Sequence, residues 1–157
     1  MKQISLFRHG KSSWKYPVDD IYRPLNGRGL RQASSMADSC SLDNPDLIIS
    51  SPANRTYGTA LIYLNARNIA IEKLQLRAEI YAANTQRLLH VLKALPESVQ
   101  DVWLFGHNPG LNDLASFVLD SPIDNIVTSA YVTLASDGQS WSELCAGSGR
   151  LINFKRP

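Results

Sequence analysis

Three short apolar runs most constrain how this chain can fold. Residues 4–7, 47–50 and 102–105 are almost continuously apolar and lack the polar alternation of a half-exposed strand. Runs of this length and composition are typical of strands inside a sheet that is covered on both faces. We therefore expect these three segments to form the centre of a buried sheet.

Helical patterns lie between these runs. Apolar residues recur at helical spacing after Asn26, after Pro52, in the segment that ends at Pro96, and over residues 111–118. Strands that alternate with helices imply crossover connections and a mostly parallel sheet. After Asp120 the pattern changes, and residues 126–135, 142–145 and 151–154 are expected to form antiparallel strands at one edge. The predicted fold class is α/β, a three-layer α/β/α arrangement.

Length and composition predict a single domain that spans residues 1–157. The chain has 157 residues, of which 44% are hydrophobic, which is enough to fill a single core. The two cysteines, Cys40 and Cys145, form no metal-binding pair, and we expect both to be reduced and buried. No apolar stretch is long enough to span a membrane and no secretory leader is evident, so we expect a cytoplasmic protein without a membrane partner.

The charge is small in total and uneven along the chain. A formal net charge of +2 does not favour a nucleic-acid partner. Positive charge is nevertheless concentrated in the first 31 residues, which contain Lys2, Arg8, Lys11, Lys15, Arg23, Arg28 and Arg31 but only Asp19 and Asp20 as acids. This segment is compatible with an anionic ligand, or simply with a solvated face.

Polar and cationic residues follow each apolar run directly. Arg8-His9-Gly10 follows the first, a segment containing Arg55 follows the second, and Gly106-His107 follows the third. Because ligands bind beyond the carboxyl ends of parallel strands, these segments are expected to meet in one crevice. Two arginines favour a dianion, since each guanidinium offers a planar fork of donors. Pro52 places Arg55 near a helix N-terminus, where anions are also favoured.

Each residue also has a structural interpretation. A single histidine after a strand is more often structural than catalytic, and Arg55 could be an ordinary surface residue of a helix. His90 lies inside a helical pattern without anion-binding neighbours, so we interpret it as structural. Trp14, Trp103 and Trp141 are expected to pack in the core or at an edge.

Beyond these patterns, the chain resembles the histidine phosphatase superfamily, which has the phosphoglycerate mutase-like fold. Arg8-His9-Gly10 resembles its signature, residues 24–33 resemble a PLTxxGxxQA segment with Asn26 in place of Thr, residues 50–60 resemble SSPxxRxxxTA, and Gly106-His107-Asn108 resembles the second histidine motif. Small size and these motifs look most like the SixA-type phosphohistidine phosphatase branch. Larger relatives insert a helical lid that this chain is too short to build.

This resemblance implies a mechanism. His9 would be the nucleophile and would carry a transient phosphohistidine, while Arg8, Arg55 and His107 would bind the phosphoryl group. No metal or other cofactor is implied, and the chain has no P-loop motif. Glu79, in a segment that resembles the family's LxE, is a candidate proton donor, although the residues after it depart from the family pattern; the alternative is a surface carboxylate.

The expected function is removal of phosphate from phosphohistidine in a partner protein, such as a signalling or phosphotransfer protein. The alternatives are a phosphatase of small phosphorylated metabolites and a non-catalytic phosphate-binding domain. Trp14, Lys15 and Tyr16 are candidate contacts for a protein substrate, or else loop-packing residues. Arg23 is expected to add a positive contact at the rim of the site, or else to lie at a helix entry or to face solvent.

Overall fold

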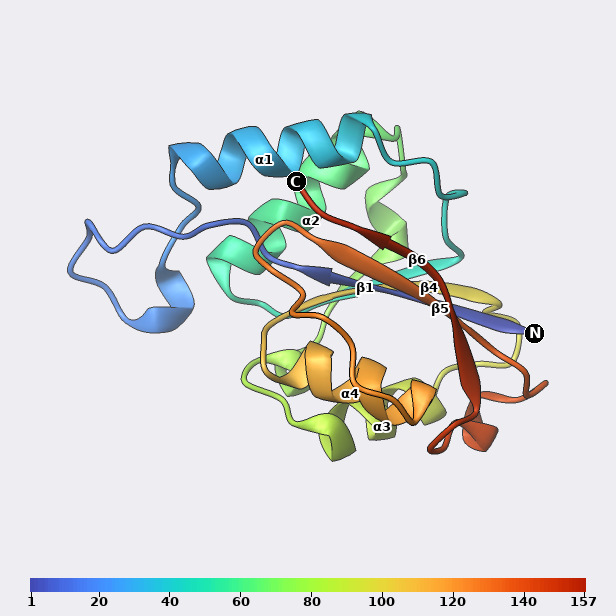
Figure 1. The fold of residues 1–157 in the computed structure, drawn as a ribbon. Helices are drawn as coiled ribbons and strands as arrows, with labels where there is room; N and C mark the ends of the chain where they lie inside the picture. Colours follow the sequence, from blue (N-terminus) through green and yellow to red (C-terminus); the bar gives the residue numbers. More distant parts are fainter.

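The computed structural model describes residues 1–157, which form a six-stranded sheet between two layers of helices (Figure 1). The strands are β1 (Lys2–Arg8), β2 (Leu47–Ser50), β3 (Leu74–Leu76), β4 (Asp101–Gly106), β5 (Tyr131–Ser136) and β6 (Gly149–Lys155), in the spatial order β3-β2-β4-β1-β5-β6. β3, β2, β4 and β1 pair in parallel, and β5 and β6 add an antiparallel edge. The predicted fold class is confirmed.

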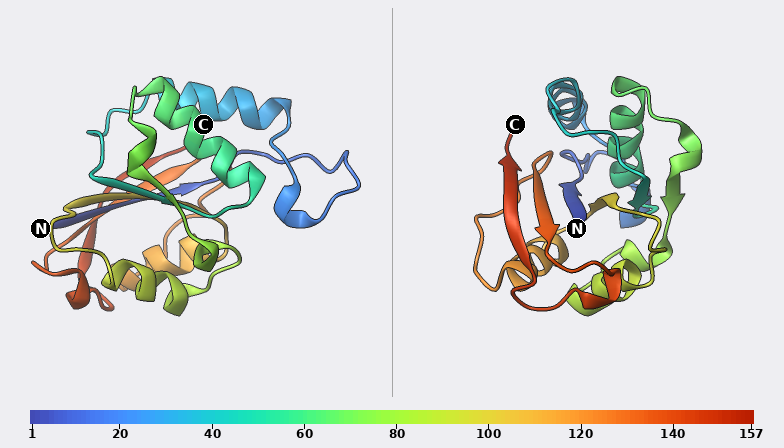
Figure 2. Two further views of the ribbon diagram at one scale, coloured as in Figure 1. Left: turned by 180° about the vertical axis from the view of Figure 1, so that it is seen from behind. Right: turned by 90° about the vertical axis from the view of Figure 1, so that its right-hand side faces the viewer.

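The helices lie on both faces of this sheet. They are α1 (Gly27–Asp38), α2 (Asn54–Ala66), α3 (Thr85–Lys93) and α4 (Gly110–Leu119), with short 3-10 turns η1 (Asp20–Tyr22), η2 (Ile71–Lys73), η3 (Ala78–Ile80) and η4 (Trp141–Glu143). α1 and α2 cover one face, and α3 and α4 cover the other (Figure 2). None of these helices has the length and apolar composition that a membrane span requires.

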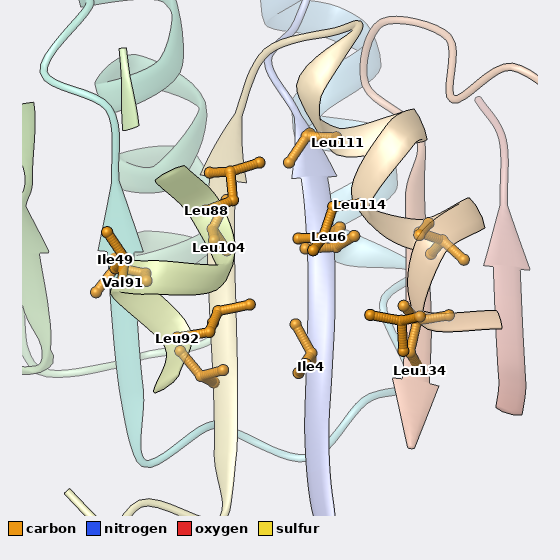
Figure 3. Close-up of a cluster of buried hydrophobic side chains, with 14 of the residues drawn as sticks. Ile4, Leu6, Ile49, Leu88, Val91, Leu92, Leu104, Leu111, Leu114 and Leu134 are labelled. Atoms are coloured by element: carbon orange, nitrogen blue, oxygen red, sulfur yellow. The ribbon is translucent and has the colours of Figure 1, made fainter. Parts of the chain in front are cut away.

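Burial on both faces explains why the central strands are almost entirely apolar. Along β4, Trp103 and Phe105 join a buried cluster of 12 residues beneath α1 and α2, whereas Val102 and Leu104 join a cluster of 21 residues beneath α3 and α4. Successive side chains of a strand point to opposite faces, so each face receives every second residue. Figure 3 shows the second cluster, in which α3 and α4 place their leucines against β1 and β4.

Two helix starts lie where the sequence predicts them. The side chain of Asn26 caps α1 by accepting a hydrogen bond of 2.8 Å from the backbone N–H of Gly29. Gly29 also touches the loop after β1, since a Cβ at this position would lie 2.1 Å from the backbone oxygen of Lys11. α2 begins just after Pro52, with Arg55 in its first turn. Both helices thereby fix the loops at the carboxyl ends of the strands.

The C-terminal region differs from expectation. β5 begins at Tyr131 rather than at residue 126, because the backbone of Ile126 is already bonded to the side chains of Arg8, Asn108 and Asn112. Residues 142–145 do not form a strand: Ser140 and Glu143 form a capping box around η4. β3 is an additional strand that the sequence analysis did not identify.

Two burial expectations are also wrong in part. Cys40 is buried as expected, but Cys145 is exposed because it lies in the turn between η4 and β6. Trp103 and Trp141 are buried, whereas the side chain of Trp14 is 78% exposed in the loop that projects after β1 (Figure 1). Trp14 is therefore not a core residue.

Candidate active site

The carboxyl ends of β1, β4 and β2 bring the predicted site residues together. Arg8, the last residue of β1, pairs with Gly106, the last residue of β4, so His9 and His107 follow side by side. Their ring centroids are 5.2 Å apart. β2 pairs with the other edge of β4, and the helix that follows it carries Arg55 to the same place.

Two adjoining cavities are formed there, with volumes of about 240 and 180 Å³, and His9 and Arg55 line both. The first cavity is strongly cationic, with Arg8, His9, Lys11, Ser12, Trp14, Arg23, Arg55 and Thr128 around it. The second is lined by His9, Asp20, Arg55, Tyr81, Ala82, His107 and Asn108. Four cationic side chains around the first cavity favour a small dianion such as phosphate.

His9 has the properties of a nitrogen nucleophile. It is buried, and its Nδ1 lies 2.7 Å from the backbone oxygen of Gly10. A carbonyl oxygen can only accept, so Nδ1 carries the hydrogen and a neutral ring has its lone pair on Nε2. Burial, together with the charges of Arg55 and Arg8, lowers the pKa of His9 to about 4. Nε2 is therefore unprotonated at neutral pH.

His107 is held beside it by residues that precede and begin α2. Its Nε2 lies 2.8 Å from the hydroxyl of Ser51 and 3.4 Å from that of Thr56. Burial lowers the pKa of His107 to about 3, with further contributions from His9 and Arg55. Two neutral imidazoles can lie this close without the repulsion that two imidazolium ions would suffer.

Thr59 links the loop of His9 to the helix of Arg55. Its hydroxyl accepts from the backbone N–H of Gly10 at 2.9 Å and donates to the backbone oxygen of Arg55 at 2.7 Å. The backbone oxygen of His9 accepts in turn from the N–H of Ser129 at 3.1 Å. The nucleophile loop is thus bonded on two sides, which fixes the direction of the His9 ring.

The arginines enter the cavity from different elements. Arg8 donates from Nη1 to the backbone oxygen of Ile126 at 3.1 Å, and its buried Nε has no partner. Arg23 lines the cationic cavity, as the expected contact at the rim requires, and it does not face solvent, since it is buried and stacks on Trp14, with Cζ 3.3 Å from the ring centroid. Arg8 and Arg23 thus reach the cationic cavity from the end of β1 and from the loop that follows it.

Asp20 is the site residue that the sequence analysis missed. Its carboxylate accepts hydrogen bonds from Arg55, Arg23 and Tyr81. These donors, with Tyr81 the strongest, hold the pKa of Asp20 well below its usual range, so it is ionised at neutral pH. The only sequence signal was an acid located three residues before Arg23 in a basic segment.

Glu79 and His90 lie outside both cavities. The carboxylate of Glu79 is exposed and pairs with Arg77 at 3.2 Å. Its own backbone N–H and Arg77 lower its pKa, so it too is ionised at neutral pH. His90 is exposed on α3. The structure brings Arg8, His9, Arg55 and His107 together and does not bring Glu79 to them.

No three His, Cys, Asp or Glu side chains are grouped so that they could hold a metal ion. What the cleft offers instead is an unprotonated ring nitrogen beside several fixed positive charges. Such a set can bind a phosphoryl group and attack it.

Comparison with known proteins agrees with this arrangement. The family model described as histidine phosphatase superfamily (branch 1) matches residues 4–118. The structure of a candidate phosphohistidine phosphatase SixA from Agrobacterium tumefaciens is 29% identical, with a TM-score of 0.82 over 99% of this chain and 98% of that one. A protein histidine phosphatase SixA complexed with tungstate shares the fold at 20% identity, with a TM-score of 0.82 over 97% of this chain and 95% of that one.

One relative is named for another substrate than the SixA structures are. Phosphoserine phosphatase 1 of Hydrogenobacter thermophilus is 39% identical over 77 residues, which are 46% of this chain. The match spans only 36% of the length of that relative. The similarity therefore concerns part of each protein.

The lowered histidine pKa values predict an unusual titration. In the phosphate-free protein, both rings should stay neutral well below pH 6.5, the ordinary value, because protonation must occur in a buried, positively charged site. Nitrogen NMR of the imidazole rings measures this, with His9→Asn and His107→Asn assigning the signals. A midpoint at or above about 6.5 for either ring would contradict the account of the site.

Proposed function

This chain belongs to the histidine phosphatase superfamily and is a phosphatase, and from that premise we propose that it removes phosphate from phosphohistidine in a partner protein. The proposed nucleophile is Nε2 of His9. The observation that carries the choice of substrate is where the two nearest candidate acids lie: Glu79 is outside both cavities and pairs with Arg77, and the Asp20 carboxylate already accepts from Arg55, Arg23 and Tyr81. Neither is prepared to protonate a leaving group.

The reaction would proceed in two displacements. First, Nε2 of His9 attacks phosphorus in line, the bond from phosphorus to the substrate imidazole breaks, and the electron pair stays on that imidazole nitrogen. A water molecule then attacks phosphorus, the bond to Nε2 breaks, and inorganic phosphate leaves. Arg8, Arg55 and His107 would stabilise the equatorial oxygens in both steps, because phosphoryl transfer depends mainly on position and charge.

The leaving group decides between substrates. When the second ring nitrogen of phosphohistidine carries a proton, the ring departs as a neutral imidazole. A serine ester must release an alkoxide, which needs a proton donor at neutral pH. A site in which no carboxylate is placed to donate a proton to the leaving group therefore favours phosphohistidine, in agreement with the SixA structures to which this fold is similar.

A second candidate function is hydrolysis of small phosphate esters such as phosphoserine. The observation in its favour is the identity of 39% over 77 residues to the Hydrogenobacter phosphoserine phosphatase. A non-catalytic phosphate-binding domain is the third alternative. The three differ in what they release: phosphate from a protein, phosphate from a small ester, or none.

The deciding experiment measures phosphate release from a histidine-phosphorylated phosphotransfer protein in chelator. We expect release by the wild type and a loss of kcat/KM of at least about 1,000-fold for His9→Ala, because the nucleophile is absent. His90→Ala is the matched control, since this histidine lies outside the cavities. Free phosphoserine, tested in parallel, should be the poorer substrate; a preference for it would reject the proposed substrate, and no release from either would reject catalysis.

The loop after β1 is a suitable contact surface for the partner protein. It projects beyond the sheet in Figure 1, and Trp14 and Tyr16 are 78% and 52% exposed. Trp14 also lines the cationic cavity, so this surface is continuous with the site. Exposed aromatic residues beside a site commonly supply contact area to a protein ligand. We propose that Trp14, Lys15 and Tyr16 contact the segment around the phosphohistidine.

Substitution in this loop should affect a protein substrate selectively. Tyr16→Ala and Lys15→Ala should raise KM for the phosphorylated protein about 10-fold, as expected when an interface contact is lost, and leave KM for p-nitrophenyl phosphate unchanged. Ile71→Ala is a control. Ile71 is 54% exposed, but it lies in η2, directly before the start of β3, whereas the site lies at the carboxyl ends of the parallel strands. Equal changes for both substrates would remove the docking role.

A further inference from the structure

Asp20 connects three segments that are remote in sequence. Its Oδ2 accepts from Arg55 at 2.9 Å and from Tyr81 at 2.6 Å, and its Oδ1 accepts from Arg23 at 2.9 Å. The loop after β1, the start of α2 and the segment after β3 therefore meet at one carboxylate. The side chain is 47% exposed, so this is a contact at the wall of the cleft rather than a core interaction.

Arg55 depends on Asp20 more than Arg23 does. The Arg55 guanidinium has its two protein contacts with this one residue, from Nη2 to the carboxylate and from Nη1 to the backbone oxygen at 2.7 Å. Arg23 has others, because it donates from Nε to the backbone oxygen of Ser13 and from Nη2 to the hydroxyl of Ser12. Ser12 and Ser13 therefore fix Arg23, and Arg23 with Tyr81 fixes the carboxylate that Arg55 contacts.

The free donors of Arg55 remain available to a ligand. A guanidinium has five N–H groups, and Asp20 takes two of those on Arg55. Arg55 lines both cavities, beside His9 in each. A long side chain held on one side presents its remaining N–H groups in one direction, which reduces the entropy lost when an oxyanion binds.

We infer that Asp20 is a positioning residue that orients the Arg55 guanidinium toward the phosphoryl group, anchored for this purpose by Arg23 and Tyr81. The inference rests on the proposed function in naming the phosphoryl group as the ligand. It also assigns Asp20 a role other than that of a proton donor, because the residue acts on substrate through Arg55.

Two effects of Asp20 on phosphate have opposite signs. Its negative charge repels a dianion nearby, so its removal should strengthen binding if charge alone matters. Loss of the oriented Arg55 should weaken binding. The direction of the change in Asp20→Asn therefore decides between a positioning residue and an internal anion that competes with phosphate for Arg55.

The test is calorimetric titration of the whole protein with inorganic phosphate. Asp20→Asn should weaken binding about 10-fold, the equivalent of one lost hydrogen bond between charged groups, and Asp20→Glu should restore part of it. Asp19→Asn is the matched control: this neighbouring carboxylate is exposed and makes no capping hydrogen bond, so binding should change less than about 2-fold.

A double variant separates positioning from a general structural effect. In an Arg55→Ala background, Asp20→Asn should change phosphate affinity less than about 2-fold, because the group through which it acts is gone. Unchanged or tighter binding by Asp20→Asn, or the same loss in both backgrounds, would overturn the inference, as would a wild type that does not bind phosphate. A wild type that binds phosphate but releases none from phosphohistidine would defeat the proposed function alone.

Discussion

Parallel pairing of β1 with β4 is the constraint on which the rest of the site depends. Because Arg8 lies opposite Gly106, the two residues that follow these strands, His9 and His107, must lie side by side. A shift of one residue in register would turn the side chains of β1 to the opposite face. The two buried clusters, one on each face of the sheet, prevent such a shift. Packing in the core therefore determines how His9 and His107 lie relative to each other.

Electrostatics at the cleft follows from this enforced proximity. Two histidines buried among arginines stay neutral, which gives His9 a free ring nitrogen. Asp20 offsets part of the positive charge of the arginines while leaving the cavity strongly cationic. The cleft is thus organised before a ligand arrives, and such organisation is the main way in which proteins stabilise the charge of phosphoryl transfer.

The sequence predicts those site residues that come directly after a strand. Arg8 and His9 come at the end of the first apolar run, Arg55 follows the second run through Pro52, and His107 follows the third, so the fold class alone brings them together. Asp20 could not be predicted in this way, because it begins η1 within the long connection from β1 to α1 and meets Arg55 and Tyr81 only through the path of that connection. Glu79 was suggested by a short motif whose continuation departs from the family pattern, and no local rule indicated that Arg77 would hold it outside the cleft. The strand expected from residue 126 failed for a similar reason, since side chains from remote segments bind the backbone there.

The central claim is that Nε2 of His9 becomes phosphorylated. Mass spectrometry of the protein quenched at alkaline pH during turnover of the phosphorylated partner protein tests this most directly, because phosphohistidine survives in base and is lost in acid. The account predicts one acid-labile phosphoryl group on His9, absent from the His9→Ala variant. Turnover of the partner protein without phosphorylation of the enzyme itself, or with the phosphoryl group on an enzyme residue other than His9, would contradict the account.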